Sequence, residues 1–143
     1  MTQQHIIQSL NHYRHWFYAA AVYNLLWGSL NVIFPSFLFD LIDTSSPNPV
    51  SFWQVTGMFV LVYAPAYWWA GRHPEKHYHF ICIGFLGKLF GPLGFIWATN
   101  SGQLPLAFGW IILFNDVIWW PVFAAYLTKI YQLHGMKAIL KGE

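Results

Sequence analysis

Two charged residues stand inside apolar stretches of the sequence, Lys88 within residues 78–98 and Asp116 within residues 104–127. A charge at the centre of a membrane span costs roughly 2.5–3.5 kcal/mol on insertion scales, so such residues are rare and tend to be functional. The turn at Gly102 lies midway between them in the sequence, so antiparallel helices joined there carry both charges at similar depth. At about 4 Å and an effective dielectric constant of about 20, their attraction is of order 4 kcal/mol. The sequence therefore predicts a Lys88–Asp116 ion pair.

Other polar and aromatic residues fall at the same depth. Asn24 and Tyr63 lie near the middle of two further apolar stretches, and Asn115 precedes Asp116. Trp119 and Trp120 follow one turn later and offer aromatic faces to a cation. The predicted ligand-binding residues are therefore Asn24, Tyr63, Lys88, Asn115, Asp116, Trp119 and Trp120. In a catalytic version of this site, Asp116 accepts a proton and Lys88 stabilises a developing negative charge.

Prolines close to the two charges predict free backbone acceptors. A proline removes the hydrogen bond to the carbonyl four residues earlier, so Pro92 frees the carbonyl of Lys88 and Pro121 frees that of Val117. In lipid these carbonyls must find partners within the protein or in a water-filled cavity. This favours a polar pocket at the middle of the membrane. Kinks that serve helix packing alone are the alternative.

Four glycines fall on one face of the helix predicted over 78–98. They are spaced three, four and three residues apart, at Gly84, Gly87, Gly91 and Gly94. Small residues let a neighbouring helix backbone approach closely, and GxxxG is the common form of this pattern. We expect a helix-packing face here, with Lys88 at its border. The pair with Asp116 is then either a structural salt bridge or part of a ligand site.

The composition excludes an ordinary soluble domain. Of 143 residues, 57% are apolar and 8% are charged, against about 25% charged residues in a typical soluble protein. The formal charge of +2 comes with no long basic tract, so no nucleic acid partner is expected. The single cysteine, Cys82, excludes an internal disulfide framework and a cysteine-based metal site built by this chain alone.

Four stretches are long and apolar enough to cross a bilayer core, which takes about 20 residues per helix. They cover residues 16–34, 50–71, 78–98 and 104–127. Their connections are too short for a further domain. We therefore predict an all-α integral membrane four-helix bundle, formed as one domain by residues 1–143.

Lysine and arginine predict the orientation, because short cytoplasmic loops carry an excess of both. They precede the first span, connect the second to the third and follow the fourth, at Arg14, Arg72, Lys76, Lys129, Lys137 and Lys141. The two opposite loops contain neither residue type. Both termini are thus expected in the cytoplasm of a bacterium, with the chain in the inner membrane. The amphipathic segment 4–13 is expected to lie along the cytoplasmic leaflet.

All seven histidines map to the predicted cytoplasmic side. His73, His77 and His79, together with Glu75, are ligand types suited to zinc, iron or copper. The preferred interpretation is that they are loop histidines beside lipid headgroups. No metal site is therefore predicted, and the cofactor is left unknown.

Two strings carry a resemblance to known families. They are Gly84-Phe-Leu-Gly-Lys-Leu-Phe-Gly-Pro-Leu-Gly-Phe95 and Asn115-Asp-Val-Ile-Trp-Trp-Pro-Val-Phe123, which look like those of small, uncharacterised four-helix bacterial membrane proteins. The peroxide-reductase label of some such proteins is not supported, since Cys82 lies in an apolar span and has no resolving cysteine. Asn115, Trp119 and Pro121 also give a distant similarity to the sterol-isomerase-like EXPERA superfamily. That similarity implies an intramembrane sterol pocket, but the paired acids of its isomerases are missing.

The preferred function is a multi-pass membrane protein whose midplane polar pocket binds a small or lipidic molecule. Whether it is an enzyme is left open. One alternative is an accessory subunit that packs into a larger membrane complex, or onto a second copy, through the glycine face. A second alternative is a small proton-coupled transporter, although the chain has no internal repeat.

Overall fold

The computed structural model describes residues 3–141, and within them the chain is 82% helical with no strand. The all-α prediction is confirmed. In chain order the elements are α1 (Gln3–Leu10), η1 (Asn11–Tyr13), α2 (Arg14–Ile33), α3 (Phe37–Leu41), α4 (Ser51–Arg72), α5 (Tyr78–Asn100), η2 (Leu106–Phe108), α6 (Gly109–Asn115), η3 (Val117–Trp119) and α7 (Trp120–Lys141).

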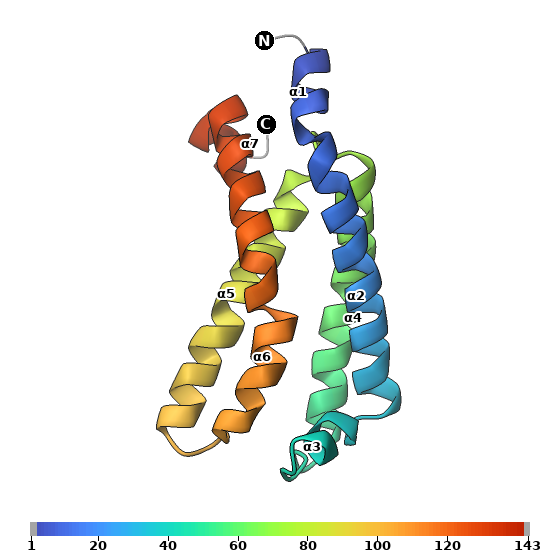
Figure 1. Cartoon of the computed structure of the whole chain (residues 1–143), viewed down its shortest axis with the longest axis vertical. Helices are drawn as coiled ribbons and strands as arrows, with labels where there is room; N and C mark the ends of the chain where they lie inside the picture. Colours follow the sequence, from blue (N-terminus) through green and yellow to red (C-terminus); the bar gives the residue numbers. More distant parts are fainter. Residues whose placement is uncertain (1–2, 142–143) are drawn as a thin grey trace.

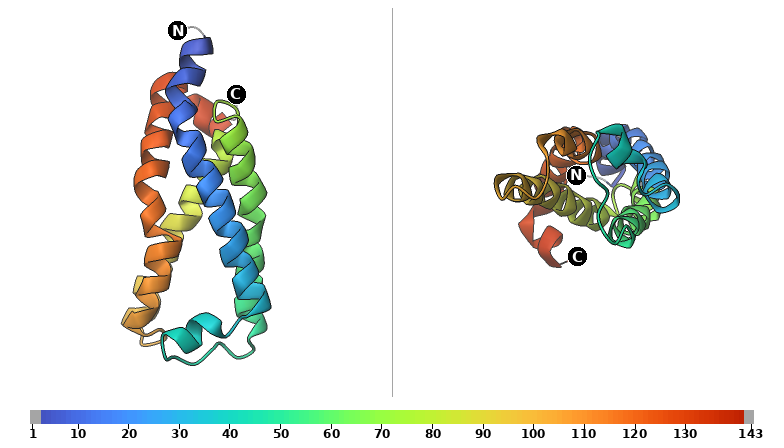
Figure 2. Two further views of the ribbon diagram at one scale, coloured as in Figure 1. Left: turned by 45° about the vertical axis from the view of Figure 1, so that its right-hand side comes forward. Right: turned by 90° about the horizontal axis from the view of Figure 1, so that it is seen from below.

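The long helices form two pairs (Figure 1). α2 packs against α4, and α5 packs against α6 and α7. The pairs meet at the end of the molecule where the termini lie and diverge toward the other end, where α3 is found (Figure 2). α7 bends at Gly135, whose φ of 75° interrupts its helical geometry.

The α2–α4 pair is held together by its own glycines and amides. A Cβ added at Gly28 would lie 2.8 Å from the Gly57 carbonyl oxygen, and one added at Gly57 would lie 3.0 Å from the Gly28 carbonyl oxygen. Asn31 accepts a hydrogen bond from the Trp53 indole, and the Gln54 amide donates to the Val32 carbonyl at 2.9 Å. The glycine-mediated contact between helix backbones therefore lies here, and not on α5 as the sequence predicts.

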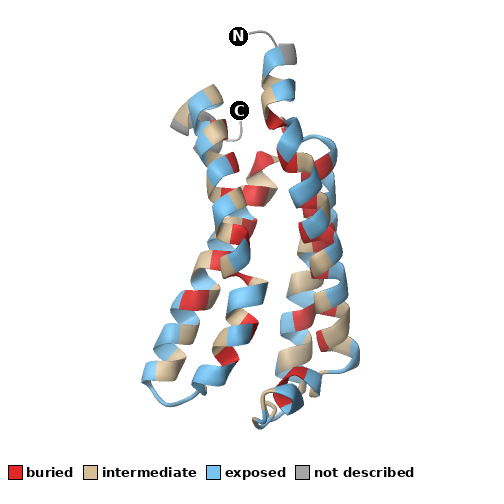
Figure 3. Cartoon of the chain, in the orientation of Figure 1, coloured by how far each residue is buried: buried red, intermediate tan, exposed pale blue. Residues whose placement is uncertain are grey.

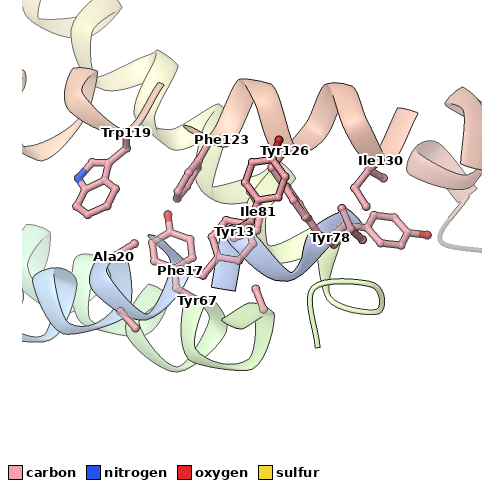
Figure 4. Packing of buried hydrophobic residues seen from close by; sticks show 13 residues of the cluster. Tyr13, Phe17, Ala20, Tyr67, Tyr78, Ile81, Trp119, Phe123, Tyr126 and Ile130 are labelled. Atoms are coloured by element: carbon pink, nitrogen blue, oxygen red, sulfur yellow. The ribbon is translucent and has the colours of Figure 1, made fainter. Parts of the chain in front are cut away.

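Two apolar clusters occupy opposite ends of the molecule. The larger is aromatic and joins both helix pairs near the termini (Figure 4), with Phe17 edge-on to Tyr126 at 4.8 Å and Tyr67 edge-on to Phe123 at 5.3 Å between ring centroids. The smaller cluster contains Leu38, Phe39, Phe108 and Ile111. It ties α3 to η2 and α6 and so closes the end where the pairs diverge.

Apolar side chains also cover the outside of the long helices, whose outward faces are exposed (Figure 3). Examples from different helices are Leu26 at 66% exposed, Val62 at 67%, Phe90 at 65% and Trp97 at 76%. Within the described part of the chain, two helical segments, Tyr78–Asn100 and Leu106–Gly135, are long and apolar enough to cross a membrane. Burying these faces requires an apolar environment or a partner.

The predicted ranges 16–34, 50–71 and 78–98 agree with α2, α4 and α5 to within two residues. The predicted range 104–127 falls largely within the helical segment Leu106–Gly135, and that segment is interrupted. α6 ends at Asn115, a 3₁₀ turn follows, and α7 begins at Trp120. The physical reason is Pro121, which has no N–H to donate and whose ring conflicts with the carbonyl four residues earlier.

Gly28→Ala is expected to lower the free energy of unfolding by about 1–3 kcal/mol, because its methyl group would overlap Leu61 and the Gly57 carbonyl. Gly94→Ala is the matched control, since nothing lies within 4 Å of its added Cβ. Denaturant titration in detergent measures both variants. Equal stability of the two would contradict the α2–α4 contact described here.

A candidate ligand-binding cavity

A cavity of about 260 Å³ lies between the two helix pairs. α2, α4, α5 and α6 all contribute to its wall, and members of both apolar clusters border it. Five of the seven predicted ligand-binding residues line it: Asn24, Tyr63, Lys88, Asn115 and Asp116. The remaining wall is mainly aromatic and aliphatic. The cavity is thus an apolar chamber with one polar side.

The structure brings Lys88 and Asp116 together. Lys88 Nζ lies 3.8 Å from Asp116 Oδ1, and it donates a hydrogen bond to the backbone carbonyl of Asn115 at 2.6 Å. Lys88 is 5% exposed and Asp116 is 6% exposed. The buried ammonium therefore has a carboxylate partner and a carbonyl partner at the same point of the fold.

The Asn115 carbonyl has no backbone N–H donor because the helix is broken between α6 and α7. The N–H of Trp119 would bond to Asn115 in a continuous helix, but it bonds to the Asp116 carbonyl at 3.2 Å. The Val117 carbonyl, which the sequence predicts to be freed by Pro121, accepts instead from the Trp120 N–H. The carbonyl without a backbone donor is thus that of Asn115, two residues before the predicted Val117, and the Lys88 ammonium donates to it.

The carbonyl of Lys88 has a partner from the facing helix. Pro92 has no N–H for it, as the sequence predicts, and the indole Nε1 of Trp120 donates to it at 3.0 Å. The two helices therefore exchange hydrogen bonds in both directions. The Lys88 side chain donates to the Asn115 carbonyl at the end of α6, and the Trp120 side chain at the start of α7 donates to the Lys88 carbonyl in α5.

The predicted glycine face of α5 receives side chains and not a helix backbone. A Cβ at Gly91 would collide with Asp116 Oδ2, and one at Gly84 would collide with the Tyr67 ring. Gly87 has only the Tyr63 hydroxyl nearby, at 3.8 Å, and Gly94 faces open space. Gly84 and Gly91 therefore make room for Tyr67 and Asp116 at the cavity wall, whereas Gly94 contacts no other helix within the described chain.

Trp119 and Trp120 are not among the residues that line the cavity. Trp119 is buried behind it, edge-on to Tyr23 at 5.4 Å, with its ring 5.9 Å from Lys88 Nζ. Trp120 makes the hydrogen bond to the Lys88 carbonyl described above. Both contact Lys88, and Trp119 gives its ammonium the aromatic face that the sequence predicts, but neither side chain borders the cavity.

Two buried residues are not among those predicted from the sequence. Tyr67 lines the cavity, and Asn31 accepts a hydrogen bond from Trp53, which also lines it. Asn31 is 2% exposed and lies two helical turns after Asn24 on the same side of α2, which is a signal that the spacing carries. Tyr67 is one of many aromatics and has no distinguishing pattern.

Two asparagines that line the cavity have unsatisfied side-chain oxygens. Asn24 donates to the Val60 carbonyl at 3.3 Å, and the side-chain oxygens of Asn24 and Asn115 are buried without a hydrogen-bond partner in the described structure.

The histidines lie in segments at the end of the molecule that carries the termini (Figure 1). His73 Nδ1 is 3.4 Å from Glu75, and its ring is 6.2 Å from that of His77, while His79 packs against Tyr78. Across residues 3–141, no group of three or more metal-ligating side chains comes together. Burial and the neighbouring His73 lower the pKa of His77.

Comparison with known proteins finds no matching family model, no matching curated protein and no matching solved structure.

Trp120→Phe is expected to destabilise the protein by about 1–3 kcal/mol, because it leaves the buried carbonyl of Lys88 without a donor. Trp110→Phe is the matched control, since Trp110 is 63% exposed on α6. Thermal unfolding in the same detergent compares the two variants. A loss no larger than that of the control would contradict the proposed pairing of Trp120 with α5.

Proposed function

We propose that this chain is a multi-pass membrane protein with four spans arranged as a bundle, whose cavity binds a small or lipidic molecule. The observation that carries the proposal is the position of the Lys88–Asp116 pair. Both residues line the cavity, together with Asn115. A salt bridge needed only to set helix register would be as effective within a packed interface.

Membrane insertion is supported by the exposed apolar faces of all four long helical segments. α2 and α4 expose residues such as Leu25 at 53% and Phe59 at 67%, in addition to the more apolar α5 and α6–α7. Contiguous apolar surface on this scale is unusual for a soluble monomer. The positively charged side chains are concentrated at the end with the termini, which supports a cytoplasmic location for that end and a bacterial inner membrane.

The wall of the cavity supports an amphiphilic ligand that enters from the side. Thr56 and Phe59 of α4 and Gly87 of α5 line the cavity and are also exposed on the outside of the molecule. Gly87 has no side chain to fill the space between α4 and α5, and this is where the ligand would enter from the surrounding lipid. The polar end of the ligand would lie against Lys88 and Asp116, and its apolar part against the aromatic wall.

The test is co-purification with matched variants. The protein is isolated gently from its own membrane, and native mass spectrometry with organic extraction identifies what is bound. Lys88→Met or Asp116→Leu alone leaves a buried charge unpaired and is expected to destabilise the protein by about 3–5 kcal/mol. The double variant removes both charges, so that only the Asn115 carbonyl left without its donor costs about 1–3 kcal/mol, and it is expected to assemble but to lose the bound molecule.

Lys129→Gln, a change of charge on α7 outside the cavity, is the control and should retain the molecule. A double variant that assembles and retains the molecule would overturn the proposed site. A wild-type protein that carries a stoichiometric protein partner and no small molecule would favour the alternative of a complex subunit.

The proposed topology has its own test in a Cys82→Ser background. Cysteines introduced at the exposed positions Ser45 and Gln103 should react with an impermeant thiol reagent applied to intact cells, after the outer membrane is permeabilised. One introduced at Gln8, exposed on α1, should react only after lysis. The reverse labelling pattern would reject the orientation.

A further inference from the structure

A second hollow, of about 390 Å³, lies at the end of the molecule where the termini are found and is separate from the cavity above. α1, the start of α2 and the connection between α4 and α5 form its wall. The ionisable side chains in the wall are Arg14, Arg72, His73, Glu75 and Lys76. Three permanent cations thus face one carboxylate.

The fold holds part of this charge in place. The Arg14 Nε donates to the Gly71 carbonyl at 2.9 Å, which satisfies an acceptor at the end of α4 and fixes the guanidinium beside the hollow. Glu75 is 3.4 Å from His73 Nδ1, so its carboxylate has a partner within the same wall. The hollow therefore keeps an excess of positive charge, with one arginine already ordered.

We propose that this hollow binds a phosphate ester, in the form of the headgroup of an anionic phospholipid. Guanidinium groups match phosphate oxygens as planar, multiply hydrogen-bonded partners, and lysine adds a point charge. A lipid is favoured over a soluble phosphate because an apolar side chain borders the site: Ile7 lines the hollow and is 36% exposed. The inference does not rest on the cavity between the helix pairs.

The experiment measures lipid binding by native mass spectrometry on the whole protein in detergent. The probes are phosphatidylglycerol, phosphatidylcholine of the same acyl chains, and soluble glycerol 3-phosphate. Phosphatidylglycerol is expected to bind with a one-to-one component that Arg72→Gln with Lys76→Gln weakens about 25-fold, from about fivefold for each basic side chain near an anionic surface. Lys129→Gln, the control on α7 outside the hollow, should leave binding unchanged.

The outcomes separate the two sources of phosphate. Tighter binding of phosphatidylglycerol than of glycerol 3-phosphate supports the lipid headgroup, and equal binding of the two replaces the lipid with a soluble phosphate ester. Binding that the double variant does not weaken overturns the site. Because Arg72 and Lys76 also set the orientation, labelling of a Gln103→Cys reporter confirms that the double variant inserts normally, and Lys76→Gln alone repeats the test with a smaller expected loss.

Discussion

Backbone carbonyls that lose their helical donors must find others inside the protein, since neither a packed interior nor lipid supplies them. Pro92 in α5 and the break before α7 each create such a carbonyl, at Lys88 and at Asn115. The side chains of Lys88 and Trp120 supply the two missing donors. This exchange fixes the register of α5 against the interrupted fourth segment, and it holds Asp116 at the cavity wall. The site is thus built from the same contacts that stabilise the helix pair.

The rest of the fold keeps space beside this point. Aromatic packing around Phe17, Tyr67 and Phe123 joins the helix pairs near the termini, and Phe39 with Phe108 closes the opposite end. Between these clusters the helix pairs diverge, and three glycines of α5 line the cavity between them. Gly84 and Gly91 admit a tyrosine ring and a carboxylate, where larger residues would push both away. Thr56, Phe59 and Gly87 line this cavity and are also exposed on the outside of the molecule, which suits the amphiphilic ligand proposed above.

Much of this arrangement is predictable from the sequence, for identifiable reasons. The equal depth of Lys88 and Asp116 follows from their symmetric distance to the turn at Gly102, and the free carbonyl of Lys88 follows from Pro92. The break in the fourth segment depends on how the chain rearranges its hydrogen bonds before Pro121, and spacing alone does not choose between the carbonyls of Val117 and Asn115. Which helix meets the glycines is likewise a tertiary outcome. Gly28 and Gly57 make the backbone contact because α2 and α4 pair along their length, a choice that local pattern does not encode.

The hydrogen bond from the Lys88 ammonium to the Asn115 carbonyl, at the break between α6 and α7, can be measured directly. Solid-state NMR on the protein in lipid bilayers, with ¹⁵N at the lysine side chains and ¹³C at the asparagine carbonyls, measures this contact through dipolar dephasing. Asn115 is the one asparagine followed by aspartate, so additional ¹⁵N labelling of the aspartate backbone selects its carbonyl. When the dephasing pulses select the lysine ammonium nitrogens and not the covalently bonded aspartate nitrogen, strong dephasing is expected from the 2.6 Å separation of Nζ and oxygen, and it should be lost in Lys88→Arg, which keeps the positive charge. Lysine-selective dephasing that is absent, or that survives Lys88→Arg, would contradict this hydrogen bond.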